Sequence, residues 1–134
     1  MKKIKAWLGA GIVMSVVSLV ISFLVQLVFP FDPSALPGMR SMSDPWMLLF
    51  FAYPFLLSAV MVWVFNHHGE SFKGNARQKS LSFGTMVWLL TGLPSFFIVW
   101  TSMTYPLGFH VDSLLGSLAT VFSGAFVLVK MLEK

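Results

Sequence analysis

The chain has 134 residues, of which 57% are hydrophobic, only 10% are charged and none is cysteine. Soluble domains carry about 25% charged residues, so this composition excludes an ordinary soluble protein, and it excludes a disordered chain because disorder requires low hydrophobicity and high charge. Without cysteine there is no disulfide scaffold and no thiol chemistry, and the length fits a single domain over residues 1–134.

Four uncharged runs divide the chain, over residues 6–31, 45–69, 80–111 and 113–129. A bilayer core of about 30 Å needs about 20 apolar residues in a helix, and each run accommodates one such helix. The third run is longer, but Tyr105, Pro106 and Gly108 favour a loop at its end. We therefore expect an all-α polytopic membrane protein, a four-helix transmembrane bundle with helices near 6–29, 45–66, 81–104 and 113–132.

Residues at the ends of these runs agree with the predicted boundaries. Asp44 followed by Pro45 is typical of a helix start, and Asp112 is placed to cap the fourth helix in the same way. Pro30 and Pro106 are expected to end the first and third helices, because the residue before a proline is disfavoured in the α conformation.

Lysine and arginine are distributed unevenly between the predicted loops. Only Arg40 lies in the first and third loops, and the other eight lie in the second loop or at the termini: Lys2, Lys3, Lys5, Lys73, Arg77, Lys79, Lys130 and Lys134. Basic residues are retained on the cytoplasmic side, so four spans predict cytoplasmic N- and C-termini in a multi-pass protein of the cell (inner or plasma) membrane. The net charge of +4 then reflects orientation, and no nucleic-acid partner is expected.

Small residues follow one face of three predicted helices. These seams are Gly11, Ser15, Ser18 and Ser22 in the first helix, Gly84, Thr91, Ser95 and Ser102 in the third, and Ser113, Gly116, Thr120 and Ser123 in the fourth. Membrane helices associate through small residues, which permit close approach and hydrogen bonding between helices. The seams predict packing within the bundle, and one of them is also a candidate interface with a second copy or a membrane-protein partner.

Two prolines lie inside predicted spans, Pro54 near the middle of the second and Pro94 near the middle of the third. Each removes a helical hydrogen bond and bends its helix. One interpretation is that the bends only help a short bundle to pack. The other is a small cavity at mid-depth, whose expected lining and entrance residues are Gln26, Tyr53, Pro54, Thr91, Pro94, Ser95 and Thr101.

Residues that carry chemistry in membranes are missing from the predicted helix centres, where ionisable side chains usually mark transport or catalysis. There is no paired-carboxylate site, cysteine nucleophile or glycine-rich phosphate loop, so no catalytic residue, no cofactor and no enzyme is predicted. His67, His68 and Glu70 suggest a metal site, but adjacent histidines on a helix point about 100° apart, and metal sites need three or four converging ligands. No metal is predicted.

The second half of the chain resembles a diffuse group of uncharacterised small four-helix membrane proteins of bacteria and archaea. The matching residues are Phe72, Gly74, Ala76, Arg77, Gly84, Tyr105, Asp112, Gly124 and Lys134, and Gln78 departs from the pattern, which has a small residue there. The resemblance implies a four-helix fold and no activity.

The sequence therefore favours a small non-enzymatic integral membrane protein, either a structural or accessory subunit or an oligomer, that acts through helix–helix and lipid contacts. An alternative stays open: a carrier or channel for a neutral or lipidic solute that uses a cavity at Pro54 and Pro94. A third, an enzyme acting on a lipid or quinone, has no candidate catalytic residue.

Overall fold

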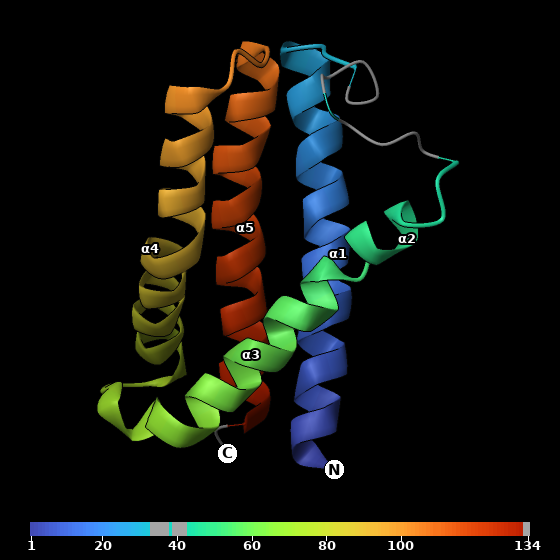
Figure 1. Cartoon of the computed structure of the whole chain (residues 1–134). Helices are drawn as coiled ribbons and strands as arrows, with labels where there is room; N and C mark the ends of the chain where they lie inside the picture. Colours follow the sequence, from blue (N-terminus) through green and yellow to red (C-terminus); the bar gives the residue numbers. More distant parts are fainter. Residues whose placement is uncertain (33–37, 39–42, 133–134) are drawn as a thin grey trace.

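The computed structural model describes residues 1–32, 38 and 43–132, and this part of the chain is helical, without strands. The helices are α1 (Lys2–Val28), α2 (Met47–Phe50), α3 (Tyr53–His68), α4 (Ala76–Ser102) and α5 (Leu107–Leu132), and a 3-10 turn, η2 (Gly69–Ser71), follows α3 (Figure 1). Three of the described helices, α1, α4 and α5, are long and apolar enough to cross a membrane.

The second predicted helix is where the structure differs most from expectation. A continuous helix over 45–66 is replaced by α2, with four residues, and α3, with 16, which join through turns at Phe51 and Ala52. Asp44 does not cap a long helix, since α2 begins at Met47 and the Asp44 carboxylate accepts a hydrogen bond from the Trp46 backbone N–H at 2.9 Å. The described residues therefore contain three long apolar helices, where the sequence predicts four.

The third and fourth predicted helices both begin earlier than expected. α4 starts at Ala76 because Asn75 and Gln78 form a reciprocal capping box, in which each side chain accepts a hydrogen bond from the backbone N–H of the other. Gln78 thus has a structural role at the start of α4. α5 starts at Leu107, directly after Pro106, whose carbonyl accepts hydrogen bonds from the N–H groups of Phe109 and His110.

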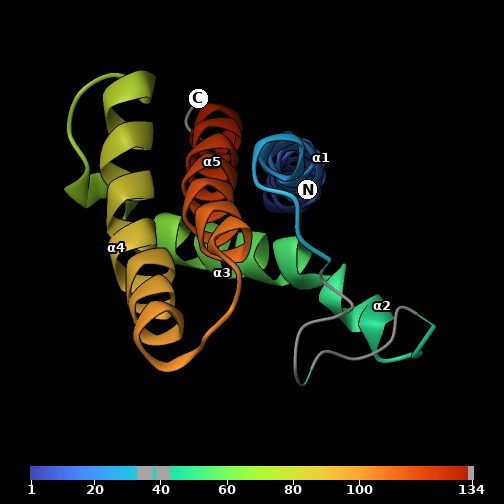
Figure 2. The ribbon, with the colours of Figure 1, turned by 90° about the horizontal axis from the view of Figure 1, so that it is seen from above.

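The long helices form a layer with α5 between α1 and α4, and α3 crosses one face of this layer obliquely (Figures 1 and 2). The start of α3 lies beside α1, where the Trp7 indole N–H donates to the Phe55 carbonyl at 2.7 Å. The end of α3 lies against α4, where the rings of Phe65 and Phe83 meet edge to face. α3 thereby ties together the half of the bundle in which both termini lie.

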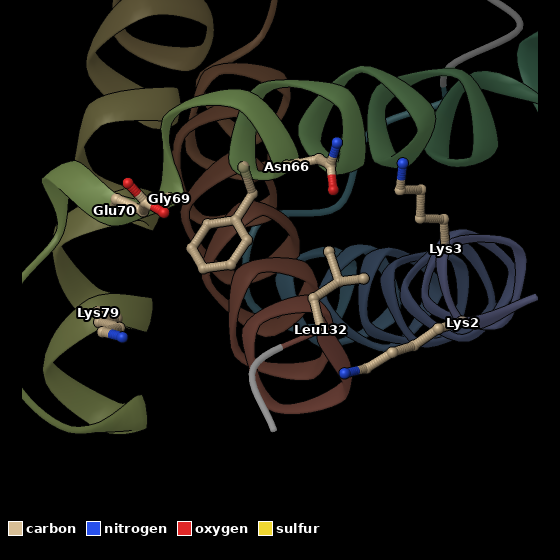
Figure 3. A pocket seen from close by; sticks show the side chains of 8 residues that line it. Lys2, Lys3, Asn66, Gly69, Glu70, Lys79 and Leu132 are labelled. Carbon is tan, nitrogen blue, oxygen red and sulfur yellow. The ribbon is translucent and has the colours of Figure 1, made fainter.

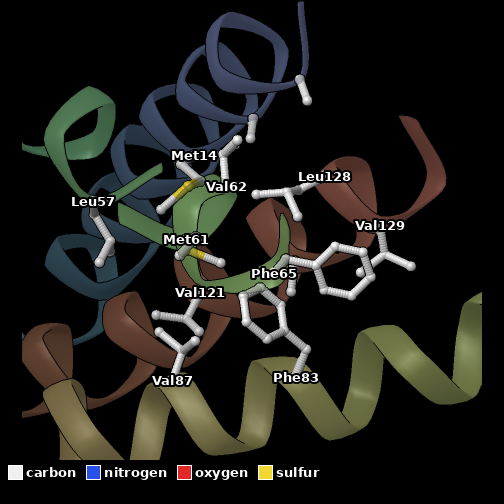
Figure 4. Packing of buried hydrophobic residues seen from close by; sticks show 13 residues of the cluster. Met14, Leu57, Met61, Val62, Phe65, Phe83, Val87, Val121, Leu128 and Val129 are labelled. Atoms are coloured by element: carbon white, nitrogen blue, oxygen red, sulfur yellow. The ribbon is translucent and has the colours of Figure 1, made fainter. Parts of the chain in front are cut away.

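The apolar core occupies the half that α3 covers (Figure 4). Met14 from α1, Met61 from α3, Phe83 from α4 and Leu128 from α5 are almost completely buried there. The opposite half, which we call the far half, contains residues 15–28 of α1, 89–102 of α4 and 107–119 of α5, and Val25 is its only buried aliphatic side chain among the described residues. The bundle is thus tightly packed at one end and more open at the other.

The start of α1, the connection from α3 to α4 and the end of α5 lie at the same end of the molecule (Figure 1). We call this the basic end, because it carries Lys2, Lys3, Lys5, Lys73, Arg77, Lys79 and Lys130. Arg40 and Lys134 lie outside the described residues. The sequence predicts cytoplasmic termini from this concentration of basic residues at one end of the molecule.

The seam glycines Gly11 and Gly84 are points of close approach within the chain. The backbone of Gly11 lies against the Phe55 ring of α3, and that of Gly84 lies against the Phe122 ring of α5, so closely that an added Cβ would collide with either ring. Gly116 of α5 differs, because a Cβ there would meet only the Asp112 carboxylate, at 3.7 Å.

The collision at Gly11 predicts a loss of stability. We expect Gly11→Ala to lower the free energy of unfolding by about 1–3 kcal/mol, because the Phe55 ring must move from its packed position. Gly116→Ala is the matched control and should lose nothing, since its Cβ has room and alanine favours helix. Unfolding in mixed micelles, followed by circular dichroism, measures both, and equal stabilities of the two variants would contradict this account of the α1–α3 contact.

Candidate functional site

The sequence predicts that Pro54 lies near the middle of a helix. In the structure it lies at the second position of α3. A proline is well tolerated there, because the first turn of a helix has no intrahelical partner for its N–H groups. The next residue, Phe55, binds α1 through its carbonyl and its ring. Pro54 therefore starts a helix beside α1 instead of bending one.

Pro94 does lie inside a helix, α4. Pro94 and Ser95 are exposed, and the Thr91 and Thr101 hydroxyls donate to carbonyls of their own helix, those of Val87 at 2.7 Å and Phe97 at 2.9 Å. The Thr91 and Thr101 hydroxyls are therefore already hydrogen-bonded within α4.

The residues of the predicted cavity are not brought together. The start of α3, which carries Tyr53 and Pro54, lies beside α1, whereas Pro94 lies on α4 at the other side of α5 (Figure 2). The Tyr53 side chain is half exposed, and Gln26 lies in the last turns of α1. The two prolines thus do not face a common space.

The structure instead brings together two polar residues of α1 and α5. Asp112 is not a cap, because α5 begins at Leu107 and Asp112 lies five residues inside the helix, about 8 Å along its axis. Its carboxylate accepts a hydrogen bond from the Ser22 hydroxyl, at 3.0 Å from Oδ1 and 2.9 Å from Oδ2. Asp112 is partly buried by this contact with α1. Ionisable residues within membrane helices are costly and usually functional, which makes Asp112 the strongest candidate site residue.

The sequence does not predict that Asp112 lies inside a helix, because a proline such as Pro106 is compatible both with the end of one helix and with the start of the next. A proline disfavours helix in the residue before it, and it is also favoured at the start of a helix. The first property predicts that the third helix ends at Pro106. The second property starts α5 directly after Pro106 and carries the Asp112 carboxylate into the helix.

His110 lies two residues before Asp112 and points to the opposite side of α5, toward α4. Its ring is 95% buried by three aromatic rings, with centroids at 4.8 Å for Trp100, 5.8 Å for Phe109 and 6.4 Å for Phe96. The Nδ1 atom of His110 is buried without a hydrogen-bond partner among the described residues. Because positions two apart on a helix diverge by about 200°, His110 and Asp112 do not converge on one ligand. In the described ranges no three histidine or acidic side chains are placed to hold a metal ion.

The Ser22–Asp112 contact predicts an energetic coupling between α1 and α5. Ser22→Ala should lower stability by about 0.6–1.7 kcal/mol, the range for hydrogen bonds between membrane helices. Ser18→Ala is the control, one turn earlier on the same helix, and its hydroxyl forms no hydrogen bond with the described residues.

A double-mutant cycle with Asp112→Ala separates the energy of the Ser22–Asp112 hydrogen bond from the energetic cost of partly burying the Asp112 carboxylate. We expect a coupling energy for the Ser22 and Asp112 pair and none for Ser18 and Asp112. A coupling of zero for both pairs, measured by unfolding in micelles, would refute the contact.

Comparison with protein-family models, with curated proteins and with solved structures found no match for this chain. The resemblance over Phe72 to Lys134 accordingly stays a prediction from sequence, and the function is inferred from the residues themselves.

Proposed function

We propose that this chain is an integral membrane protein without enzymatic activity of its own, which serves as an accessory subunit through contacts with another membrane protein and with lipid. The observation that carries the proposal is the backbone of α4 at Pro94. Pro94 has no N–H, so the Leu90 carbonyl lacks the donor that a regular helix provides.

Leu90 lies on a part of α4 that no other described helix covers. Leu90 is 70% exposed, and Pro94 and Ser95 are also exposed. The Ser95 hydroxyl forms no hydrogen bond with the described residues, in contrast to the nearby Thr91 and Thr101. A carbonyl that has lost its regular helical donor and a hydroxyl without a partner are unfavourable in hydrocarbon, because lipid tails offer no donor or acceptor.

The rest of this face is apolar. Around Pro94 it exposes large apolar side chains, Phe97 and Ile98 among them, each with more than 60% of its surface accessible. α3 covers only the half at the basic end, so α4 in the far half packs mainly against α5 (Figure 1). A spanning helix with a hydroxyl or amide donor would supply hydrogen-bond partners to the Leu90 carbonyl and the Ser95 hydroxyl, which lipid tails do not do. We therefore favour a protein partner at this face.

Site-specific photo-crosslinking in native membranes tests the proposal. A photoreactive residue at Phe97 should give one discrete protein adduct, whereas the same residue at Phe23, an equally exposed position on α1, should give only lipid adducts. Pro94→Ala restores the missing N–H and should lower the adduct yield at position 97 about threefold, the effect of losing one hydrogen bond of about 0.6 kcal/mol between membrane helices.

An adduct of twice the mass of the chain would identify the partner as a second copy, which is the oligomeric form of the proposal. Lipid adducts alone at both positions would overturn it.

One observation favours a second candidate function, a carrier for a neutral solute or lipid. The Asp112 carboxylate lies between α1 and α5, and it accepts a hydrogen bond from a hydroxyl, that of Ser22. A neutral solute that carries hydroxyl groups offers the same donor. This candidate rests on Asp112 and not on the two prolines.

Flux into liposomes tests this candidate. Protein-containing vesicles should take up glycerol or scramble a fluorescent phospholipid faster than protein-free vesicles, and Asp112→Ala should remove at least about 90% of the excess rate, because losing a hydrogen bond to a charged group costs about 1.5–3 kcal/mol. Ser113→Ala, a neighbour on the same helix, is the control and should keep the rate. Rates that match protein-free vesicles for both probes would reject the carrier.

A further inference from the structure

A groove of about 360 Å³ opens at the basic end of the bundle (Figure 3). Its lining comes from α1, α3, η2, α4 and α5, so that it exists only in the folded chain. Phe65 and Leu132 provide apolar walls, and the other lining side chains are polar or charged. The volume lies within the range of about 300–1,000 Å³ that is usual for small-ligand sites.

Positive charge dominates the groove. Lys2, Lys3 and Lys79 line it together with one carboxylate, that of Glu70. Figure 3 shows the Lys3 amino group on the side of Asn66 and the Lys2 amino group on the side of Leu132. Neither Lys2 nor Lys3 forms an ion pair with a described residue. Two ammonium groups are therefore available to an anion, and the Asn66 amide offers a further hydrogen-bond donor.

The groove lies at the level where phospholipid headgroups are found. α1 has 27 residues and α5 has 26, which corresponds to about 40 Å of helix at 1.5 Å per residue. The hydrocarbon core is about 30 Å thick and the whole bilayer about 40–45 Å, so the ends of these helices reach the headgroups. The groove is bordered by the first turn of α1 and the last turn of α5.

We propose that this groove binds the phosphodiester headgroup of an anionic phospholipid, with Lys3 and Asn66 as its phosphate contacts and Lys2 adding positive charge on the side of Leu132. The Phe65 and Leu132 walls suit the start of the acyl chains, which a soluble anion does not have. Glu70 favours a singly charged diester over inorganic phosphate, which carries more negative charge. The inference deepens the lipid part of the proposed function and rests on its membrane location, but it requires no protein partner at α4.

Binding to the purified full chain in neutral micelles, followed by native mass spectrometry, tests the site. Phosphatidylglycerol should bind with one tight site, and phosphatidylcholine should not. The double variant Lys2→Gln, Lys3→Gln should weaken phosphatidylglycerol binding about 30-fold, from about 1 kcal/mol for each lysine near an anionic lipid surface.

The control is Lys5→Gln, Lys73→Gln, which removes the same charge at the same end but from outside the groove. It should weaken binding by clearly less than the roughly 30-fold expected of the groove variant, because neither side chain lines the groove. Equal weakening by the two double variants would overturn the groove in favour of diffuse surface charge. Circular dichroism establishes that both variants fold.

A second arm separates the two sources of phosphate. Inorganic phosphate at millimolar concentration should leave phosphatidylglycerol bound, because it lacks contact with the apolar walls. Displacement of the lipid by inorganic phosphate would overturn the lipid assignment and make the groove a site for soluble phosphate. Photo-crosslinking at Phe97 is independent of this measurement, so failure of the groove and failure of the protein partner are distinguishable.

Discussion

The backbone of a chain inside hydrocarbon must find its hydrogen-bond partners within protein, and prolines are the positions where this molecule meets that constraint. Pro106 lies just before α5, Pro54 begins α3, and Pro94 interrupts the hydrogen bonding of α4. The first two lie where a helix needs no N–H donor from them. Of these three prolines, only Pro94 deprives a carbonyl within a helix, that of Leu90, of its regular donor. Leu90 lies in the part of α4 that α3 does not cover.

Hydrogen bonds from side chains join the helices to one another. The Trp7 indole N–H binds the Phe55 carbonyl next to the turns at Phe51 and Ala52, which holds the start of α3 on α1. The Trp88 indole N–H binds the Ser117 hydroxyl at 2.9 Å and joins α4 to α5. Polar contacts of this kind join the long helices where lipid removes most of the hydrophobic driving force for association.

The sequence predicts the helical class, the gathering of basic residues at one end and four long helices, of which three are present as long apolar helices, because uninterrupted apolar runs and charge are local properties of the chain. It does not predict the division of residues 45–66 into α2 and α3, since that division accompanies the contact of Phe55 with Trp7 and Gly11, which are more than 40 residues away. It also misplaces Asp112, because a proline alone does not tell whether it ends one helix or begins the next. The sequence therefore indicates a site at the prolines, whereas the structure places a carboxylate between α1 and α5.

The two halves of the bundle differ in what holds them together. Apolar packing around Met14, Met61, Phe83 and Leu128 holds the half at the basic end, where the groove lined by Lys2 and Lys3 also lies. The far half lacks such a core, so the Ser22–Asp112 hydrogen bond and the rings around His110 provide much of its cohesion. Segments with few buried apolar contacts open at lower free energy than packed ones. We therefore expect the helices to separate most easily in the far half, which also contains the Asp112 carboxylate and the exposed part of α4 around Pro94.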